Sequence, residues 1–180
     1  MRTRLSRDEG GFGLIELIIA LTILNIGILA TVAALNSGAL ALQRASKLST
    51  ATAIADAQME LYRAILYDAI ALDVAELAVD DDDPTYTGDA AYRVDSPDNL
   101  PMETATCAVP LPNECNPVRA VTGPDGKSYR VDTYIVEQAP VASSRPVKIV
   151  TVVVRDGTNL SKSLVRAEST FDQSTGSPAS

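Results

Sequence analysis

A single carboxylate, that of Glu16, lies near the start of a long apolar stretch that runs from Gly11 to Leu35. No charged residue occurs between Glu16 and Arg44. A helix needs roughly 20 apolar residues, at about 1.5 Å rise each, to cross a bilayer core, and this stretch is longer than that. A carboxylate at membrane depth costs about 2.5 to 3.5 kcal/mol on insertion scales, so it needs a partner or a role there. The sequence therefore predicts a membrane helix that carries one functional acid.

The residues before the apolar stretch indicate its orientation. Arg2, Arg4 and Arg7 form a basic leader, and basic residues beside a spanning helix stay on the cytoplasmic side. A secretory signal peptide would have a shorter apolar core that ends at a small-residue cleavage site, whereas this stretch continues into further helix-forming sequence. We therefore expect a retained, single-pass anchor in the cytoplasmic membrane, with the C-terminal part of the chain outside.

The junction between the leader and the apolar stretch reads GFGLIEL. It resembles the prepilin cleavage and methylation motif of type IV pilins and type II secretion pseudopilins. The resemblance implies that a prepilin peptidase cuts between Gly11 and Phe12 and that Phe12 becomes the N-methylated mature N-terminus. Glu16 matches the acidic residue at the fifth mature position in this family. The stretch 46–63, which ends in QMELYR, and the sequence NIGILA resemble more narrowly the minor pilins related to PilV and the I-type pseudopilins.

The new amine at Phe12 offers Glu16 a partner. An α-amine has a reference pKa of about 7.7 to 8, so it is largely charged near neutral pH, and methylation leaves the charge in place. Our hypothesis is that Glu16 of one subunit pairs with the Phe12 amine of a neighbour in a filament core. The alternative is that Glu16 lies at the level of the lipid headgroups, favoured there by the positive end of its helix.

One long helix is expected to extend well past the membrane, because the chain has no proline from Phe12 to Asp83. Residues 12–43 form its hydrophobic half and 44–70 its amphipathic half. Asn25 and Gly27 are weak points, and the sequence leaves open whether Gly27 is a close-packing position or a tolerated residue. The amphipathic half carries an apolar stripe at helical spacing that a C-terminal domain should cover: Leu48, Ala51, Ala55, Met59, Tyr62 and Leu66.

The last third of the chain is predicted to be β. Residues 127–138 and 160–170 alternate between apolar and polar types, 145–155 are rich in β-branched residues, and Gly-Pro-Asp-Gly and Asp-Gly supply turns. Three strands in 127–171 would form an antiparallel sheet with one apolar face for the helix. The predicted fold is therefore α+β, the pilin fold, followed by a disordered tail at 172–180.

Between the helix and these strands, residues 71–126 are expected to form a loop region with a short strand at Ala90 to Val94. Cys107 and Cys115 enclose seven residues with two prolines. In an oxidising exterior, two cysteines this close are expected to form a disulfide, and two thiols without histidine make a poor metal site.

The remaining charged residues suggest no catalysis. The run Asp80 to Asp83 favours a solvated acidic loop over a calcium site, because its spacing differs from that of an EF-hand. The basic residues on the expected strands favour the solvated side of a sheet over contact with DNA: Lys127, Arg130, Arg145, Lys148, Arg155, Lys162 and Arg166. The chain has no histidine and shows no phosphate-binding loop or nucleophile motif, so we expect neither an enzyme nor a cofactor.

Length and net charge limit the number of domains and the kinds of partner. The 180 residues allow one modest domain beside the anchor, and the net charge of −8 gives no attraction to nucleic acid. The expected function is a structural subunit, a minor pilin or pseudopilin, whose partners are the prepilin peptidase, other pilin subunits, the assembly platform and the membrane. The alternative is a membrane-anchored extracellular binding protein that joins no filament. Cleavage after Gly11 distinguishes the two, whereas the sequence does not separate pilus from secretion pseudopilus.

Overall fold

The structure is a computed structural model that describes residues 13–93, 102–138 and 145–173. The leader, the predicted cleavage site after Gly11, the N-terminal residue Phe12 and most of the predicted tail lie outside the described residues. The chain divides into two compact units, Met1–Arg44 and Ala45–Ser180, which we call the N-terminal and the C-terminal unit.

Helix α1 spans Leu14–Arg63 and therefore contributes to both units. It begins where the backbone N–H groups of Glu16 and Leu17 donate to the carbonyl of Gly13. The helix is continuous through Asn25 and Gly27, which were the weak points in the sequence. By length and composition α1 is able to cross a membrane, with a mean hydropathy of 2.4 over its most apolar window.

An antiparallel sheet is the centre of the C-terminal unit. It consists of β3 (Val118–Thr122), β4 (Ser128–Gln138), β5 (Val147–Asp156) and β6 (Asn159–Asp172), hydrogen-bonded in that order. The three predicted strands correspond to β4, β5 and β6, and the predicted α+β class is confirmed. Strand β3 was not predicted, because its five residues are too few to show a clear alternation and follow directly on a proline-rich loop.

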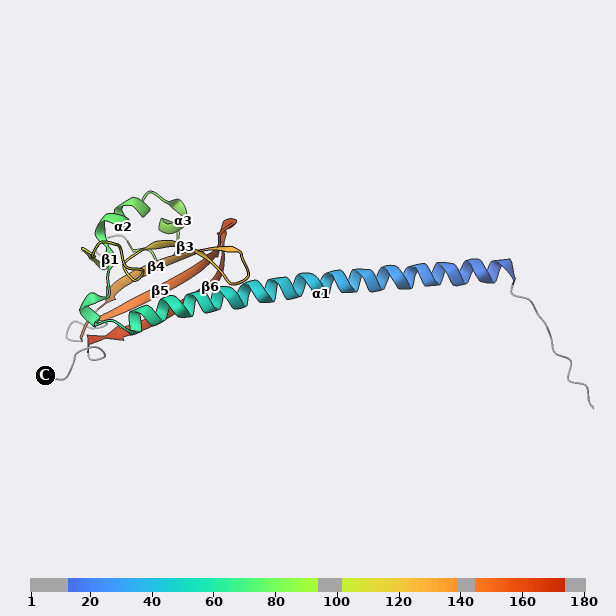
Figure 1. The fold of residues 1–180 in the computed structure, drawn as a ribbon, viewed down its shortest axis with the longest axis horizontal. Coiled ribbons are helices and arrows are strands. Elements are labelled where there is room, and N and C mark those ends of the chain that lie inside the picture. Colours follow the sequence, from blue (N-terminus) through green and yellow to red (C-terminus); the bar gives the residue numbers. More distant parts are fainter. Residues whose placement is uncertain (1–12, 94–101, 139–144, 174–180) are drawn as a thin grey trace, which may run out of the picture. The chain divides into compact units, whose positions relative to one another are not determined.

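The two faces of the sheet are both covered (Figure 1). The end of α1 buries Ala51, Ala55, Met59 and Tyr62. On the other face Tyr86 stacks on Tyr134 of β4, with ring centroids 4.5 Å apart. Neighbouring residues of a strand point to opposite faces, and both faces of the sheet are covered. Strand β5 is therefore apolar or buried along nearly its whole length, with four fully buried residues: Val150, Val152, Val153 and Val154.

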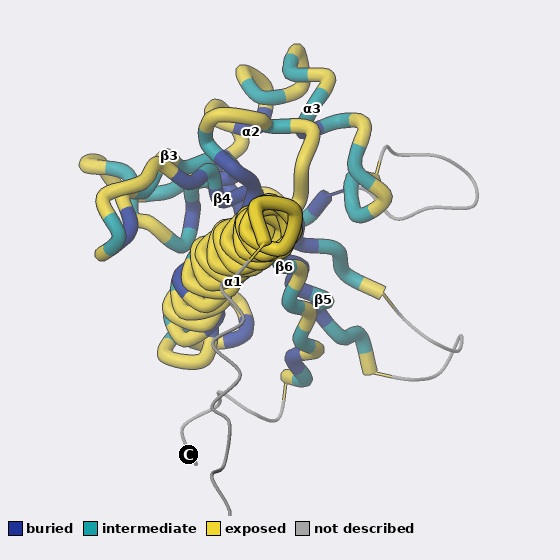
Figure 2. Tube along the Cα trace, turned by 90° about the vertical axis from the view of Figure 1, so that its right-hand side faces the viewer, coloured by how far each residue is buried: buried dark blue, intermediate teal, exposed yellow. Residues whose placement is uncertain are grey.

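The predicted apolar stripe of α1 was wrong at its two ends. The predicted amphipathic half, 44–70, extends too far, because α1 ends at Arg63 and Leu66, which is 54% exposed, lies beyond it. Leu48 is 49% exposed, whereas the polar residues Thr50 and Gln58 are buried. The amide nitrogen of Gln58 donates to the carbonyl of Asn113 at 3.1 Å, whereas its buried amide oxygen has no hydrogen-bond partner among the described residues. Figure 2 shows that positions along α1 are mostly exposed, whereas many positions in the strands are buried.

The predicted loop region is more ordered than the sequence suggested. It contains β1 (Leu72–Asp73), α2 (Val74–Asp80), α3 (Pro84–Thr87) and β2 (Thr104–Ala105), and β1 pairs with β2 in parallel. Two aspartates start the helices: Asp73 accepts from the N–H groups of the first turn of α2, and Asp83 accepts from the N–H of Thr85 in α3. The described part of the predicted strand at 90–94, residues 90–93, is not a strand.

Candidate functional site

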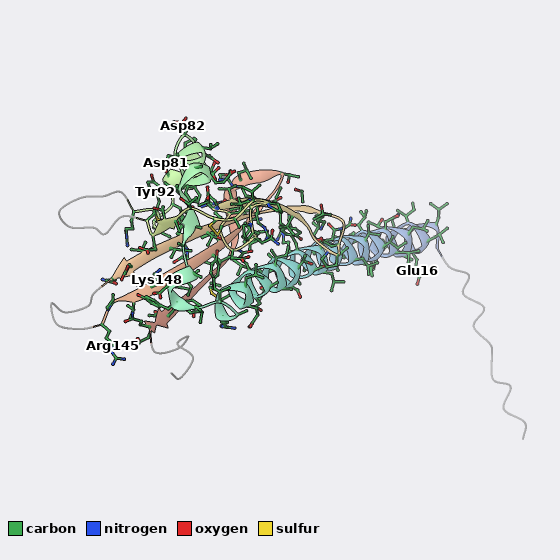
Figure 3. All side chains as sticks on the ribbon, turned by 60° about the vertical axis from the view of Figure 1, so that its left-hand side comes forward. Glu16, Asp81, Asp82, Tyr92, Arg145 and Lys148 are labelled. Atoms are coloured by element: carbon green, nitrogen blue, oxygen red, sulfur yellow. A yellow bond between two sulfur atoms is a disulfide. The ribbon has the colours of Figure 1, made fainter. Side chains whose placement is uncertain are left out.

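The acid that the sequence singled out, Glu16, lies in the first turn of α1. Its side chain is exposed and projects from the helix near its start (Figure 3). An acid at this end of a helix faces the positive end of the helix dipole, which is favourable. The expected partner of Glu16 is the Phe12 amine of a neighbouring subunit, and Phe12 itself lies outside the described residues.

The part of α1 in the N-terminal unit presents apolar side chains around its whole circumference. Among residues 13–44 every position is exposed, including Leu14, Ile15, Leu21, Ile28 and Leu35. Two hydroxyls in this part are satisfied inside the helix: Thr22 Oγ1 donates to the carbonyl of Ile18 at 2.8 Å, and Thr31 Oγ1 donates to that of Gly27. This surface needs lipid or other helices around it, because long exposed apolar surfaces are unfavourable in water.

A disulfide joins Cys107 and Cys115, as the sequence predicted. Asp73 holds this loop in place, since its carboxylate accepts from the N–H of Cys107 at 2.9 Å and its own N–H donates to the carbonyl of Cys115 at 2.8 Å. The N–H groups of Cys107 and Glu76 keep the pKa of Asp73 below its usual range. One carboxylate therefore connects the disulfide loop to the start of α2.

The same loop is attached to α1. Tyr62 Oη donates to the carbonyl of Glu114 at 2.7 Å, next to the bond between Gln58 and Asn113. Burial raises the pKa of Tyr62 to about 12, so this hydroxyl stays a donor at neutral pH. Two side chains one turn apart on α1 thus bind two successive carbonyls of the disulfide loop.

The basic residues of the strands were predicted to be solvated, and for three of them this was wrong. The side chains of Arg130, Lys148 and Arg155 are 12%, 4% and 8% exposed. Lys148 Nζ donates to the carbonyl of Ile70 at 2.8 Å, lies 3.1 Å from Glu103 Oε1 and sits over the ring of Tyr67. Burial without such partners would be very unfavourable for a charged group.

The two buried arginines belong to a chain of six alternating charges. Asp132, which is fully buried on β4, accepts from Arg130 Nε and from Arg155 Nε, each at 2.6 Å. Arg130 also pairs with Asp83, and Arg155 Nη2 donates to Asp89 at 2.5 Å. Arg166 of β6 closes the chain by donating to the other oxygen of Asp89 at 2.6 Å.

This charge chain attaches the α3 segment to three strands of the sheet. Burial raises the pKa of Asp132 although two arginines oppose the shift. Burial alone would also raise the pKa of Asp89, but the N–H of Ala91 and the guanidinium groups of Arg166 and Arg155 together hold it below its usual range. Three aspartates and three arginines balance one another, so this arrangement has a structural role and offers no free acid or base.

The signal that could have revealed this chain is the sequence Arg130-Val131-Asp132. On a strand, residues two apart share a face, so this spacing places opposite charges side by side. The distant partners, Asp89 and Arg155, have no counterpart signal in the sequence.

The acidic run at 80–83 was predicted to be a solvated loop, and for part of the run this was wrong. Asp83 pairs with Arg130 and starts α3, and Asp81 accepts from Tyr92 Oη at 2.8 Å. Asp82 is exposed, and Figure 3 shows Asp81 and Asp82 at the outer end of the C-terminal unit. Among the described residues, no group of three or more acidic or cysteine side chains has the arrangement of a metal site.

Comparison with known proteins supports the assignment made from the N-terminal motif. The family model described as the prokaryotic N-terminal methylation motif matches residues 6–32. Comparisons with curated proteins and with solved structures found no match. The matched residues include the leader junction, Glu16 and most of the apolar stretch from Gly11 to Leu35. The chain therefore carries the N-terminal methylation motif that is the signature of type IV pilins and pseudopilins.

Proposed function

We propose that this chain is a structural subunit, a minor pilin or pseudopilin, of a type IV pilus or a type II secretion filament. A prepilin peptidase removes residues 1–11, Phe12 is methylated, and the mature chain leaves the membrane by packing α1 against the helices of other subunits. The observation that carries this proposal is the methylation motif at residues 6–32, in register with an apolar helix able to span a membrane.

Glu16 is the residue that we assign to assembly. The exclusion of an apolar helix from lipid gives no driving force for helix association, since lipid tails are as apolar as leucine. A carboxylate in this environment gains by meeting a positive charge, and the amine of Phe12 in a neighbouring subunit supplies one. Support for this role comes from the position of Glu16, which is exposed in the first turn of α1 without an ion pair among the described residues.

The C-terminal unit has a structural role in this proposal. The buried charged side chains of its charge chain are paired with one another, and its disulfide suits an oxidising exterior. We propose that the protein is not an enzyme and that it resides first in the cytoplasmic membrane, with its N-terminus inside, and then in a surface filament. The alternative, an anchored binding protein that joins no filament, shares the membrane helix but does not need cleavage.

The decisive experiment is mass spectrometry of the N-terminal peptide from protein purified from membranes, with and without co-expressed prepilin peptidase. We expect a methylated Phe12 as the first residue when the peptidase is present. The variant Gly11→Val should remain uncut, and Gly10→Val should be cut as in the wild type. An intact N-terminus in the presence of an active peptidase would reject the proposal and favour the anchored binding protein.

A second experiment tests the role of Glu16 after processing. The variant Glu16→Val should be cut and methylated normally but should be lost from sheared filaments, because the neighbouring amine then has no partner. Leu17→Val, an adjacent change that keeps the acid, should be incorporated. Normal incorporation of processed Glu16→Val would show that Glu16 has no part in assembly.

A further inference from the structure

Two asparagines, Asn25 and Asn36, lie in the apolar half of α1, and the proposed role of Glu16 does not explain them. Both side chains are exposed, and within residues 13–93, 102–138 and 145–173 neither makes a hydrogen bond. The hydroxyls of Thr22 and Thr31 differ in this respect, since both donate to carbonyls of their own helix. Asn25 lies within the apolar stretch, where no water is available to satisfy an unpaired amide, and Asn36 directly follows the end of that stretch at Leu35.

The two amides share one side of the helix. They are separated by 11 residues, which is close to three turns, so their directions differ by only about 20° and their levels by about 16 Å. Glu16 lies nine residues before Asn25 and therefore points about 180° away. The amides and the assembly acid thus occupy opposite sides of α1.

We propose that the side of α1 defined by Asn25 and Asn36 binds a second copy of this chain in the membrane, before assembly. Copies inserted with the same orientation run parallel, so each asparagine meets its own counterpart at the same depth. An asparagine amide has both donor and acceptor groups, so two of them form a complementary pair, and asparagine is known to connect helices in membranes and coiled coils. A second copy is the partner that necessarily carries amides at both levels.

This inference rests on the membrane insertion of α1 that the proposed function requires, but not on cleavage or on Glu16. It is tested with the full, uncut chain in vesicles of bacterial phospholipid, after alkaline extraction has verified that the chain is inserted. Cross-linking uses new cysteines and copper phenanthroline as the oxidant. Val32 lies between the two asparagines on the same side of the helix, and Ala34 lies on the side of Glu16.

We expect the variant Val32→Cys to form a disulfide between two copies, and the matched variant Ala34→Cys to form much less. In the Val32→Cys background, Asn25→Leu or Asn36→Leu should weaken association about threefold to thirtyfold per position, measured as the protein-to-lipid ratio needed for half-maximal cross-linking. Thr22→Val, which removes a hydroxyl already bonded within the helix, should leave cross-linking unchanged.

Equal cross-linking from Val32→Cys and Ala34→Cys would overturn the inference. Cross-linking that stays unchanged when both asparagines are replaced would also overturn it. Cross-linking of Val32→Cys to a co-inserted different pilin helix, without a product between two copies, would also overturn it. Failure of the chain to insert would instead count against the proposed function. Normal cleavage after Gly11 together with absent pairing would reject the inference alone.

Discussion

Asp132 is the central residue of the charge chain in the C-terminal unit. It is fully buried and is the sole acid that contacts both Arg130 and Arg155 among the described residues. A buried ion pair adds little stability compared with an apolar replacement, but the loss of one member is severe because the others remain charged and buried.

We therefore predict that Asp132→Asn lowers the free energy of unfolding by about 3 kcal/mol. The measurement is urea unfolding of the C-terminal unit, followed by circular dichroism at pH 7. The matched variant Asp82→Asn, which removes the same charge from an exposed position, should change stability by less than about 0.5 kcal/mol. Similar effects of the two substitutions would mean that the charge chain contributes no stability.

Removal of the charge of Asp80 is predicted to raise stability, in contrast to the loss predicted for Asp132. Burial raises the pKa of Asp80 to about 6. Attraction to Arg130 opposes this shift, and repulsion from Glu76 and Asp83 adds to it. Because the pKa is higher in the folded state, the contribution of this carboxyl to folding stability is favourable at low pH and is lost as the pH rises through about 6. Asp80 is also the last residue of α2, where the helix dipole disfavours a negative charge.

Asp80→Asn should accordingly stabilise the protein by about 1 kcal/mol at pH 8. The gain should shrink as the pH falls below 6 and should disappear near pH 4, where the native carboxyl is already protonated. Thermal unfolding at pH 4, 6 and 8, with Asp82→Asn in parallel, measures this difference. A gain that is constant across this range would contradict the assigned titration.

At the scale of elements, the disulfide loop 107–115 connects parts of the chain that are far apart in sequence. It contacts α1 through Gln58 and Tyr62 and the start of α2 through Asp73. Closing a loop of this length removes disorder from the unfolded chain, which corresponds to about 2.5 kcal/mol in the chain-entropy model.

The double variant Cys107→Ser, Cys115→Ser should therefore unfold at a lower temperature, with a loss of about 2 to 3 kcal/mol. Dithiothreitol should lower the stability of the wild-type protein by a similar amount and leave the double variant unchanged. Hydrogen exchange should increase first at the N–H groups of Ala75 and Glu76, which Asp73 caps. Unaltered exchange at these two positions would show that the loop does not support α2.

The sequence predicted the elements that have long, regular patterns. The alternation in 127–138 and the β-branched run in 145–155 led directly to β4 and β5, and the absence of proline led to α1. Helices α2 and α3 were missed because they are short and depend on caps, whose aspartates look like any acidic loop. The charge chain was missed because Asp89, Asp132 and Arg155 meet through the folded sheet, and pairing at such separations leaves no periodic signal.

For the whole molecule, the two units differ in whether their apolar side chains are exposed or form a buried core. The N-terminal unit exposes apolar side chains, whereas the buried residues among those described all occur at position 50 or later. An apolar core, the charge chain and the disulfide are therefore all available within residues 45–180. This division suits a subunit whose first part exchanges lipid for protein neighbours while its second part stays folded outside the membrane.

We predict that a chain truncated to residues 45–180 is soluble without detergent and unfolds cooperatively, because residues 13–44, the described part of the removed segment, contribute nothing to the buried core. Its melting temperature should lie within about 3 °C of that of the full chain in detergent, a difference below about 1 kcal/mol. A shorter chain that begins at Ala64 loses Ala51, Ala55, Met59 and Tyr62 from the core and should not fold. Differential scanning calorimetry and near-ultraviolet circular dichroism distinguish the two cases. Aggregation of the 45–180 chain would mean that the C-terminal unit needs the membrane helix for folding as well as for anchoring.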